Sequence, residues 1–243
     1  MFLNKLSKKI KNSIKKIFSF FGIGIYRKNT VYSTDLKYES ELSFWIGKFN
    51  AENHVFKNTH YKEIMLGIAQ ELDDAFLRDK IVVDFGCGPR GSLVWTAVPK
   101  LRIGVDVLVD KYFDFFGSEM IDDGYLYVKS TEKYIPIPTG FVDIIFTMNS
   151  MDHTDNFEAM INELFRILKT EGEFIGSFNI NELATLNEPQ TLTIERIEKA
   201  FSEKFEIKHK LTAFSYKDFF DQKAKKPSET DVCKLWIRCK KVK

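Results

Sequence analysis

The fold of this 243-residue chain is decided by one stretch, Ile81-Val82-Val83-Asp84-Phe85-Gly86-Cys87-Gly88-Pro89-Arg90-Gly91-Ser92. An apolar strand runs directly into a turn that holds three glycines, and a helix is expected after the turn. A strand followed by a turn and a helix is the building unit of an open α/β sheet.

The same alternation of helical and strand-like patterns extends from residue 59 to the C-terminal end. A helical stripe before the first strand consists of Tyr61, Ile64, Met65, Ile68, Ala69, Leu72 and Phe76. Strands are expected at 80–85, 101–105, 125–128, 142–148, 173–178, 206–211 and 232–239. Helices are expected at 156–169, with Asp155 as N-cap and Glu158 completing a capping box, and at 194–205.

Strands that alternate with helices imply an α/β fold with a doubly wound, mostly parallel sheet of seven strands and right-handed crossovers. Strand 142–148 is continuously apolar after Asp143, as expected for a strand buried on both faces. The last two strands have no clear helix between them. They therefore imply an antiparallel hairpin, with an antiparallel C-terminal strand at the sheet edge.

The composition is that of an ordinary globular protein, with 44% hydrophobic and 29% charged residues and 23 phenylalanines. Such apolar content excludes disorder over the whole chain. The three cysteines, Cys87, Cys233 and Cys239, are odd in number and show no CxxC spacing. We therefore expect neither a disulfide framework nor a zinc cage, and a cytoplasmic location fits best.

A net charge of +2 conceals an uneven distribution: residues 1–28 carry eight basic residues and no acidic one, whereas residues 29–204 carry 17 basic and 29 acidic residues. Within 1–21, apolar residues recur at helical intervals opposite lysines, a pattern typical of a helix lying on an anionic membrane surface. This favours peripheral attachment at the inner membrane face. A helix docked on the domain or on a partner, and a cleaved targeting peptide, are the alternatives. The apolar stretch 17–26 is too short to span a bilayer.

Two carboxylates restrict what the glycine turn can bind. The glycine spacing matches a dinucleotide fingerprint, which by itself also fits a turn that serves packing alone. Asp84 precedes the first glycine by two residues, where it would repel a pyrophosphate but could bind an ammonium group. Asp106 ends the following strand, where a carboxylate can accept both hydroxyls of a ribose. A nucleoside with a cationic arm, S-adenosylmethionine, meets both requirements, and Asp84 disfavours a nicotinamide-dependent oxidoreductase.

The stretch 84–91 resembles the first motif of the class I S-adenosylmethionine-dependent methyltransferases. Asp106 matches the ribose-binding acid of that family, and 132–146 and 158–174 resemble its later segments. The resemblance covers roughly 59–211 and is closest to the small-molecule and glycan branch (methyltransferase type 11). It implies a Rossmann-like methyltransferase domain at 59–243, after a basic extension at 1–28 and a candidate substrate cap at 29–58.

The resemblance also implies roles for individual residues. The methionine end of the cofactor would be held by Asp84 and the turn Gly86, Cys87 and Gly88, with Gly91 closing the motif. Asp106 would hold the ribose, and Ser130, Thr131 or Glu132 would face the adenine amine. The family usually shows an Asp followed by a small residue here, whereas this chain reads Lys129-Ser130-Thr131-Glu132.

The chemistry of methyl transfer is an in-line displacement, which a protein assists mainly by positioning. Asn149, Asp152 and His153 follow strand 142–148 and should lie in the crevice beyond the strand ends. His153 is the first candidate base, and Asp152 is an alternative base or a group that holds a substrate hydroxyl. A role of His153 in lining the cofactor pocket is the alternative.

The acceptor is expected to be a small molecule or a surface glycan that is methylated on a hydroxyl. Segment 39–45 combines aromatic and polar groups, as a sugar site requires, and it fits an amphipathic capping helix equally. Glu188-Pro189-Gln190 should face the same crevice. A lipid or quinone acceptor at the membrane surface, or a non-catalytic cofactor-binding module, are the rival interpretations. The chain has no run of Asn or Asp followed by Pro-Pro and an aromatic residue, so a nucleic-acid substrate is not indicated. No local spacing of ligand residues resembles a metal motif.

Overall fold

The computed structural model describes residues 34–121, 124–202, 204–221 and 223–242. The chain divides into two units, 1–34 and 35–243, and every contact reported below lies within the second. The basic segment 1–28, for which the sequence predicts a membrane or docking helix, lies outside the described residues. Among the helices that the structure does describe, none has the length and apolar character needed to cross a bilayer.

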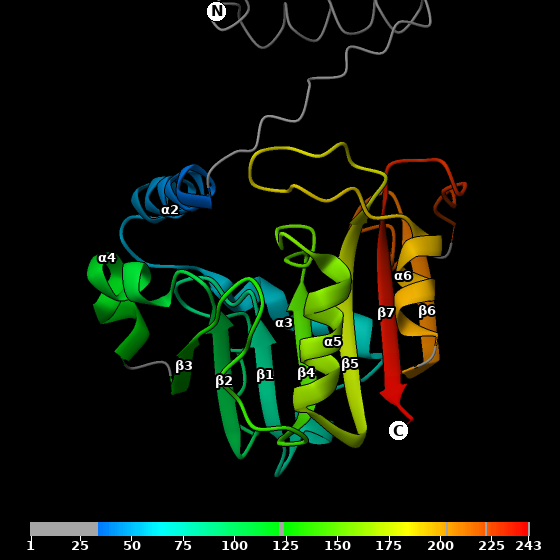
Figure 1. Cartoon of the computed structure of the whole chain (residues 1–243), viewed down its shortest axis with the longest axis horizontal. Coiled ribbons are helices and arrows are strands. Elements are labelled where there is room, and N and C mark those ends of the chain that lie inside the picture. The colour runs from blue at the N-terminus through cyan, green and yellow to red at the C-terminus, as the bar shows by residue number, and fades with distance from the viewer. Residues whose placement is uncertain (1–33, 122–123, 203, 222, 243) are drawn as a thin grey trace, which may run out of the picture. The chain divides into compact units, whose positions relative to one another are not determined.

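The helices and strands form one α/β arrangement (Figure 1). The helices, including two short 3-10 helices (η), are α2 (Thr34–Ala51), η2 (Asn58–His60), α3 (Tyr61–Ala69), η3 (Asp74–Leu77), α4 (Val109–Ile121), α5 (Phe157–Ile167) and α6 (Ile194–Phe201). The strands are β1 (Ile81–Phe85), β2 (Leu101–Asp106), β3 (Tyr125–Lys129), β4 (Val142–Met148), β5 (Leu168–Ile180), β6 (Phe205–Ala213) and β7 (Cys233–Lys241).

The seven strands form one sheet in the order β3-β2-β1-β4-β5-β7-β6. Strands β1 to β5 pair in parallel, whereas β7 runs antiparallel between β5 and β6. The predicted antiparallel hairpin is therefore present at the edge, but the prediction that the C-terminal strand forms the edge was wrong, because β7 lies between β5 and β6 and β6 is the outermost strand. The strand order reverses between β1 and β4, and open parallel sheets bind ligands beyond the carboxyl ends of the strands at such a point.

The sheet is covered on both faces, because successive side chains of a strand point to opposite sides. On one face, Val83 and Ile145 join the apolar sides of α5 and α6. On the other face, Val82 and Phe146 pack with α3. Figure 1 shows α5 and α6 in front of the sheet and α3 behind it. A third cluster joins α4 to the apolar side of α2.

The helix expected after the glycine turn does not form, and residues 86–100 connect β1 to β2 through turns. Prolines at 89 and 99 bracket the segment and disfavour a regular helix within it. Leu93 is fully buried and packs in the α3 cluster, while Trp95 Nε1 lies 3.4 Å from Met65 Sδ. The connection therefore covers the sheet with individual side chains in place of a helix.

Four predicted boundaries were also wrong. Helix α3 ends at Ala69 because Gln70 adopts a left-handed conformation, and Leu72 is left fully exposed. The N-cap of α5 is Asn156, whose side chain accepts from the Ala159 N–H at 2.9 Å, and not Asp155.

Strand β5 begins at Leu168, directly after α5, and contains a register shift near Glu171, whose φ is +66°. The helix predicted at 194–205 ends at Phe201, and Phe205 already belongs to β6.

Candidate cofactor and acceptor site

A cavity of about 820 Å³ lies at the carboxyl ends of the central strands. The ends of β1, β2 and β4, the glycine turn, helix α2 and the loop 181–193 contribute to its lining. The lining includes Lys37, Tyr38, Glu41, Trp45, Gly86, Cys87, Gly88, Asp106, Ser130, Glu132, Asn149, His153 and Glu188. The cavity therefore coincides with the crevice that the strand order predicts.

The glycine turn has a conformation and surroundings that favour glycine. Gly86 and Gly88 have φ angles of +70° and +61°. A β-carbon at position 86 would overlap Ser150, whose Oγ donates to the Phe85 carbonyl at 2.8 Å. One at position 88 would lie 2.7 Å from the ring of Trp45. The turn therefore presents its backbone to the cavity, and the side chains of Ser150 and Trp45 pack closely against it.

Gly91 does not have the role that its position in the cofactor-binding motif predicts. Its φ is +80°, and a β-carbon there would lie 2.5 Å from the Tyr125 ring. It does not line the cavity. Since no helix follows the turn, this glycine allows close approach to β3 and does not serve helix packing.

Asp84 is fully buried beneath the glycine turn and outside the cavity lining. One carboxylate oxygen, Oδ2, accepts the Ser92 N–H and the Tyr125 hydroxyl, the latter at 3.2 Å. Among the described residues, no donor reaches the other oxygen, Oδ1. Burial raises the pKa of Asp84 to about 6. Asp84 therefore fixes the shape of the turn and retains one unused oxygen.

Asp106 lines the cavity at the end of β2. Its Oδ2 accepts the Gly88 N–H at 3.1 Å and its Oδ1 accepts the Leu108 N–H at 2.9 Å. Burial raises the pKa of Asp106 to about 6. Each carboxylate oxygen has a second lone pair, so the group can also accept two ligand hydroxyls.

The three candidate adenine residues lie in different surroundings. Ser130 lines the cavity, and its buried Oγ has no partner among the described residues. Thr131 is exposed and outside the lining, and its Oγ1 accepts the N–H groups of Lys133 and Tyr134. Glu132 lines the cavity but is already engaged by α2. Ser130 is thus the candidate with an unused polar atom.

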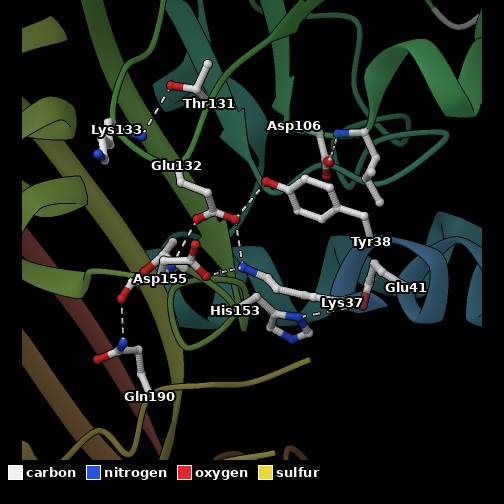
Figure 2. Close-up of polar contacts among 12 residues, drawn as sticks. Lys37, Tyr38, Glu41, Asp106, Thr131, Glu132, Lys133, His153, Asp155 and Gln190 are labelled. Carbon is white, nitrogen blue, oxygen red and sulfur yellow. Dashed lines mark hydrogen bonds and ion pairs between the residues drawn. The ribbon is translucent and has the colours of Figure 1, made fainter. Parts of the chain in front are cut away.

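Polar contacts with residues that follow β3 and β4 hold helix α2 over this side of the cavity (Figure 2). Lys37 Nζ donates to Glu132 at 2.7 Å and to Asp155 at 3.0 Å, and the Tyr38 hydroxyl donates to Glu132 at 2.9 Å. Lys37 is only 7% exposed. An amine buried to this degree requires its anionic partners, so these contacts hold α2 in one position.

Asn149 follows β4 with a φ of +55°, a conformation that asparagine tolerates better than most residues. Its N–H donates to the Ser177 carbonyl at 2.9 Å. Its side-chain Oδ1 is buried and has no partner within the described part of the chain. The side chain therefore contributes an unused acceptor to the cavity lining.

The other end of the cavity is acidic and centres on His153. Nδ1 of the imidazole lies 3.7 Å from a Glu41 oxygen, and Nε2 lies 3.6 Å from a Glu188 oxygen. Asp152 is 3% exposed and lies outside the lining. Burial is the main cause that raises the pKa of both Asp152 and Glu188.

Comparison with known proteins identifies the fold and the reaction. Residues 83–176 match the model of a methyltransferase domain. This match places residues 83–176 in a methyltransferase domain, and the sheet has the fold of the class I S-adenosylmethionine-dependent methyltransferases. The protein is accordingly an enzyme, a methyltransferase, and one solved protein of this fold, a geranyl diphosphate C-methyltransferase, is in complex with S-adenosyl-L-homocysteine. Comparison with curated protein sequences gives no match.

Several solved methyltransferases share the fold of this methyltransferase domain. An S-adenosylmethionine-dependent methyltransferase from Thermotoga maritima has a TM-score of 0.56 at 17% identity, covering 84% of this chain and 98% of that one. Geranyl diphosphate C-methyltransferase from Streptomyces coelicolor has a TM-score of 0.53 at 15% identity, covering 68% and 71%. A methyltransferase from Mesorhizobium loti has a TM-score of 0.51 at 11% identity, covering 68% and 92%. At these identities the likeness establishes the fold alone.

The lining of the methyltransferase cavity fits the cofactor. Buried polar atoms are normally hydrogen-bonded, and those that are not require an explanation. Ser130 Oγ and Asn149 Oδ1 in the lining, and Asp84 Oδ1 beneath the glycine turn, are buried and without partners among the described residues. An ammonium group, an adenine amine and a ribose hydroxyl of the cofactor are donors that could satisfy such atoms.

The sequence predicted a cap at 29–58 but missed the contacts by which α2 joins the methyltransferase site. Lys37 and Tyr38 carried no motif, and their partner Glu132 lies more than 90 residues further along the chain. Glu41 and Trp45 belonged to the segment considered as a sugar platform. Their role in the structure is to face His153 and Gly88. The only available signal was the mixture of aromatic and charged residues on one helix.

Proposed function

We propose that this methyltransferase transfers the methyl group of S-adenosylmethionine to a hydroxyl of a polar small molecule, with the sugar of a surface glycan as the preferred class. The observation that carries the proposal is the continuity of one cavity from Asp106 to His153. The acceptor would occupy the His153 end, beyond the cofactor.

The reaction requires a hydroxyl oxygen aligned with the methyl carbon. The new C–O bond forms from an oxygen lone pair while the C–S bond breaks, and its electron pair stays on sulfur, giving S-adenosylhomocysteine. The hydroxyl also loses its proton. The cluster of His153, Asp152 and Glu188 is the proposed place for that proton loss, with His153 as the candidate proton acceptor.

Polar groups around His153 support a hydroxylated acceptor. Loop 181–193 forms a turn in which the Thr185 N–H donates to the Glu188 carbonyl at 2.8 Å and the Glu188 N–H donates to Thr185 Oγ1 at 3.0 Å. This turn directs Asn187 towards Glu41, with an Nδ2 to Oε2 distance of 3.4 Å. Carboxylate and amide groups of this kind can bind several hydroxyls at once.

A lipid or quinone acceptor remains the alternative proposal. It is motivated by the basic, amphipathic residues 1–21, which would attach a cytoplasmic enzyme to the inner membrane face. Binding of the full chain and of a variant lacking residues 1–28 to anionic vesicles tests this attachment. Equal binding by the two proteins would contradict it.

The experiment for the main proposal has two stages. Calorimetric titration with S-adenosylmethionine, S-adenosylhomocysteine and NAD should show binding of the two adenosyl ligands alone. Labelled methyl transfer is then measured with nucleotide sugars, lipid-linked saccharides, quinols and amines, with Asp106→Ala as the inactive control. Transfer to a sugar hydroxyl supports the proposal, and transfer only to amines would exclude the hydroxyl assignment.

A further inference from the structure

Three side chains at the acceptor end of the cavity converge on one point. A carboxylate oxygen of Asp152, a ring nitrogen of His153 and a carboxylate oxygen of Glu188 all lie within 4.8 Å of one another. They come from two loops, since Asp152 and His153 follow β4 and Glu188 follows β5. The parallel pairing of β4 with β5 brings these loops to the same edge of the sheet.

The spacing within the cluster is that of ligands around a common ion. His153 Nε2 and the Glu188 oxygen are 3.6 Å apart, beyond a good hydrogen bond. Two ligand atoms that each lie about 2.1 Å from a tetrahedral metal ion are separated by about 3.4 Å. The observed separation therefore leaves room for a cation between the two atoms.

A carboxylate also faces the far side of the imidazole, at a distance longer than that of a hydrogen bond. A metal-bound histidine usually donates its other ring N–H to a carboxylate, which fixes the ring orientation. Glu41 of α2 faces Nδ1 at 3.7 Å (Figure 2), whereas Glu188 faces the other ring nitrogen, Nε2. Glu41 is itself oriented by the indole N–H of Trp45, at 3.1 Å.

Asp152 supplies an independent indication of a cation. The residue is 3% exposed, and its Oδ1 has no hydrogen-bond partner among the described residues. A buried carboxylate is costly unless a cation or several donors compensate it. Lys234, a nearby cation of β7, donates to Asn179 at 2.7 Å. Asp152 therefore lacks a partner that a bound ion would provide.

We propose that Asp152, His153 and Glu188 bind a divalent transition-metal ion at the acceptor end of the cavity. One imidazole and two carboxylates suit Mn²⁺, Fe²⁺, Co²⁺ or Zn²⁺ better than Ca²⁺. His153 and Glu188 line the cavity while Asp152 lies behind them, so the open coordination positions face the acceptor.

The catalytic role of the ion rests on the proposed function, whereas the binding of the ion does not depend on it. A metal ion that binds the acceptor hydroxyl lowers its pKa and fixes its oxygen. His153 then acts as a ligand and no longer as the proton acceptor, and the hydroxyl proton leaves to solvent through the mouth of the cavity. The cluster would thereby achieve the proton loss that the proposed function requires.

The test measures Mn²⁺ binding to the full chain after treatment with EDTA, by loss of the free-ion electron paramagnetic resonance signal. We expect one Mn²⁺ per chain at micromolar concentration, with at least tenfold weaker binding in Asp152→Asn and in Glu188→Gln. Glu195→Gln, which changes an exposed carboxylate at the start of α6, is the matched control and should bind like the wild type. Spin-echo modulation from an imidazole nitrogen should accompany the bound ion.

Affinity for S-adenosylhomocysteine, measured on the same samples, separates this proposal from the proposed function. Adenosyl binding that persists in Glu188→Gln shows that the variant is folded. Absence of Mn²⁺ and Zn²⁺ binding, or equal binding by the wild type and both cluster variants, would overturn the metal site and leave the proposed function standing. Metal binding without methyl transfer to any hydroxyl would support the metal site and contradict the proposed function.

Discussion

Trp45 of α2 lies directly against Gly88 of the glycine turn, so that a β-carbon at position 88 would come within 2.7 Å of the indole. The helix that closes the cavity therefore rests on the backbone expected to hold the methionine end of the cofactor. Because Asp106 accepts the Gly88 N–H, the contact links α2, the turn and the proposed ribose site.

Gly88→Ala should displace α2 and weaken adenosyl binding, whereas Gly86→Ala should destabilise the sheet. An alanine in the left-handed conformation costs about 1–2 kcal/mol. At position 88 the added methyl group meets the end of one side chain, which can move. At position 86 it meets Ser150, which is bound to the Phe85 carbonyl, so overpacking raises the total to roughly 2–5 kcal/mol. Chemical denaturation and calorimetry with S-adenosylhomocysteine measure the two effects.

The double variant Trp45→Ala with Gly88→Ala provides the control. Removing the indole should restore part of the adenosyl affinity lost in Gly88→Ala, because only the backbone cost remains. Affinity in the double variant that is no better than in Gly88→Ala would show that the Trp45 contact is unimportant.

Lys37→Met should loosen α2 without unfolding the sheet. The substitution keeps the aliphatic stem but leaves Glu132 and Asp155 without their shared cation. Hydrogen bonds to charged groups contribute about 1.5–3 kcal/mol each, so the docking of α2 should weaken by an amount of that order. Faster hydrogen exchange in 34–51 and faster release of S-adenosylhomocysteine are the expected results. Glu39→Gln, at an exposed position of the same helix, should change neither.

Local patterns predicted the strands well because each pattern lies within a few residues. Strand Val142–Met148 has the predicted bounds, since a continuous apolar run leaves no alternative to burial. The glycine turn and Asp106 were equally accessible, because each belongs to one strand end. Local patterns failed where tertiary contacts determine the role of a side chain. Asp155 resembled an N-cap, but its carboxylate binds Lys37 of α2.

The acceptor end could not be predicted from spacing for the same reason. Asp152 and His153 were both predicted to lie in the crevice, but only His153 lines the cavity, because Asp152 is buried behind it. No local metal motif exists, because the third group is Glu188 in a later loop. Only the pairing of β4 with β5 brings the three together. The prediction of a helix after the glycine turn was wrong for a different reason. Individual side chains such as Leu93 cover the sheet where a helix would have packed.

Arg238→Met should destabilise the β7 side of the sheet. The guanidinium binds both oxygens of Glu173 on β5, at 3.1 and 2.9 Å, and also binds Glu71 at 2.9 Å. It further donates to the Ala69 carbonyl at the end of α3. Because the removed charge leaves two carboxylates unpaired in a partly buried site, we expect a loss of about 2–4 kcal/mol in the free energy of unfolding.

Arg238→Lys should recover only a part of that stability, because an ammonium cannot bind a carboxylate through two parallel hydrogen bonds. Lys240→Met on the same strand, which removes a pair with the exposed Glu171, is the matched control and should leave the free energy of unfolding almost unchanged. Similar losses in Arg238→Met and Lys240→Met would contradict the structural role of the buried network.

Adenosyl binding should fall as the pH is lowered through about 6. Burial raises the pKa of Asp106 to about 6, and only the ionised carboxylate can accept both ribose hydroxyls. A group with a pKa of 6 is about one-tenth ionised at pH 5, so S-adenosylhomocysteine should bind about tenfold more weakly there than at pH 7. Asp84, with its pKa also raised to about 6, should steepen the dependence. Calorimetric titrations between pH 5 and 7.5 measure it.

The same carboxyl should affect the stability of the cofactor-free protein in the opposite direction. Its pKa is about 3.9 in the unfolded chain, so between pH 4 and pH 6 the folded state binds the proton that the unfolded state has lost. The contribution of Asp106 to stability is thus complete below pH 4 and is lost as the pH rises through 6, by about 2–3 kcal/mol. Asp106→Asn should lack this decrease, so the difference in unfolding free energy between wild type and variant should change with pH in that window. A constant difference from pH 4 to pH 7 would show that Asp106 is not held in a protonation-sensitive environment.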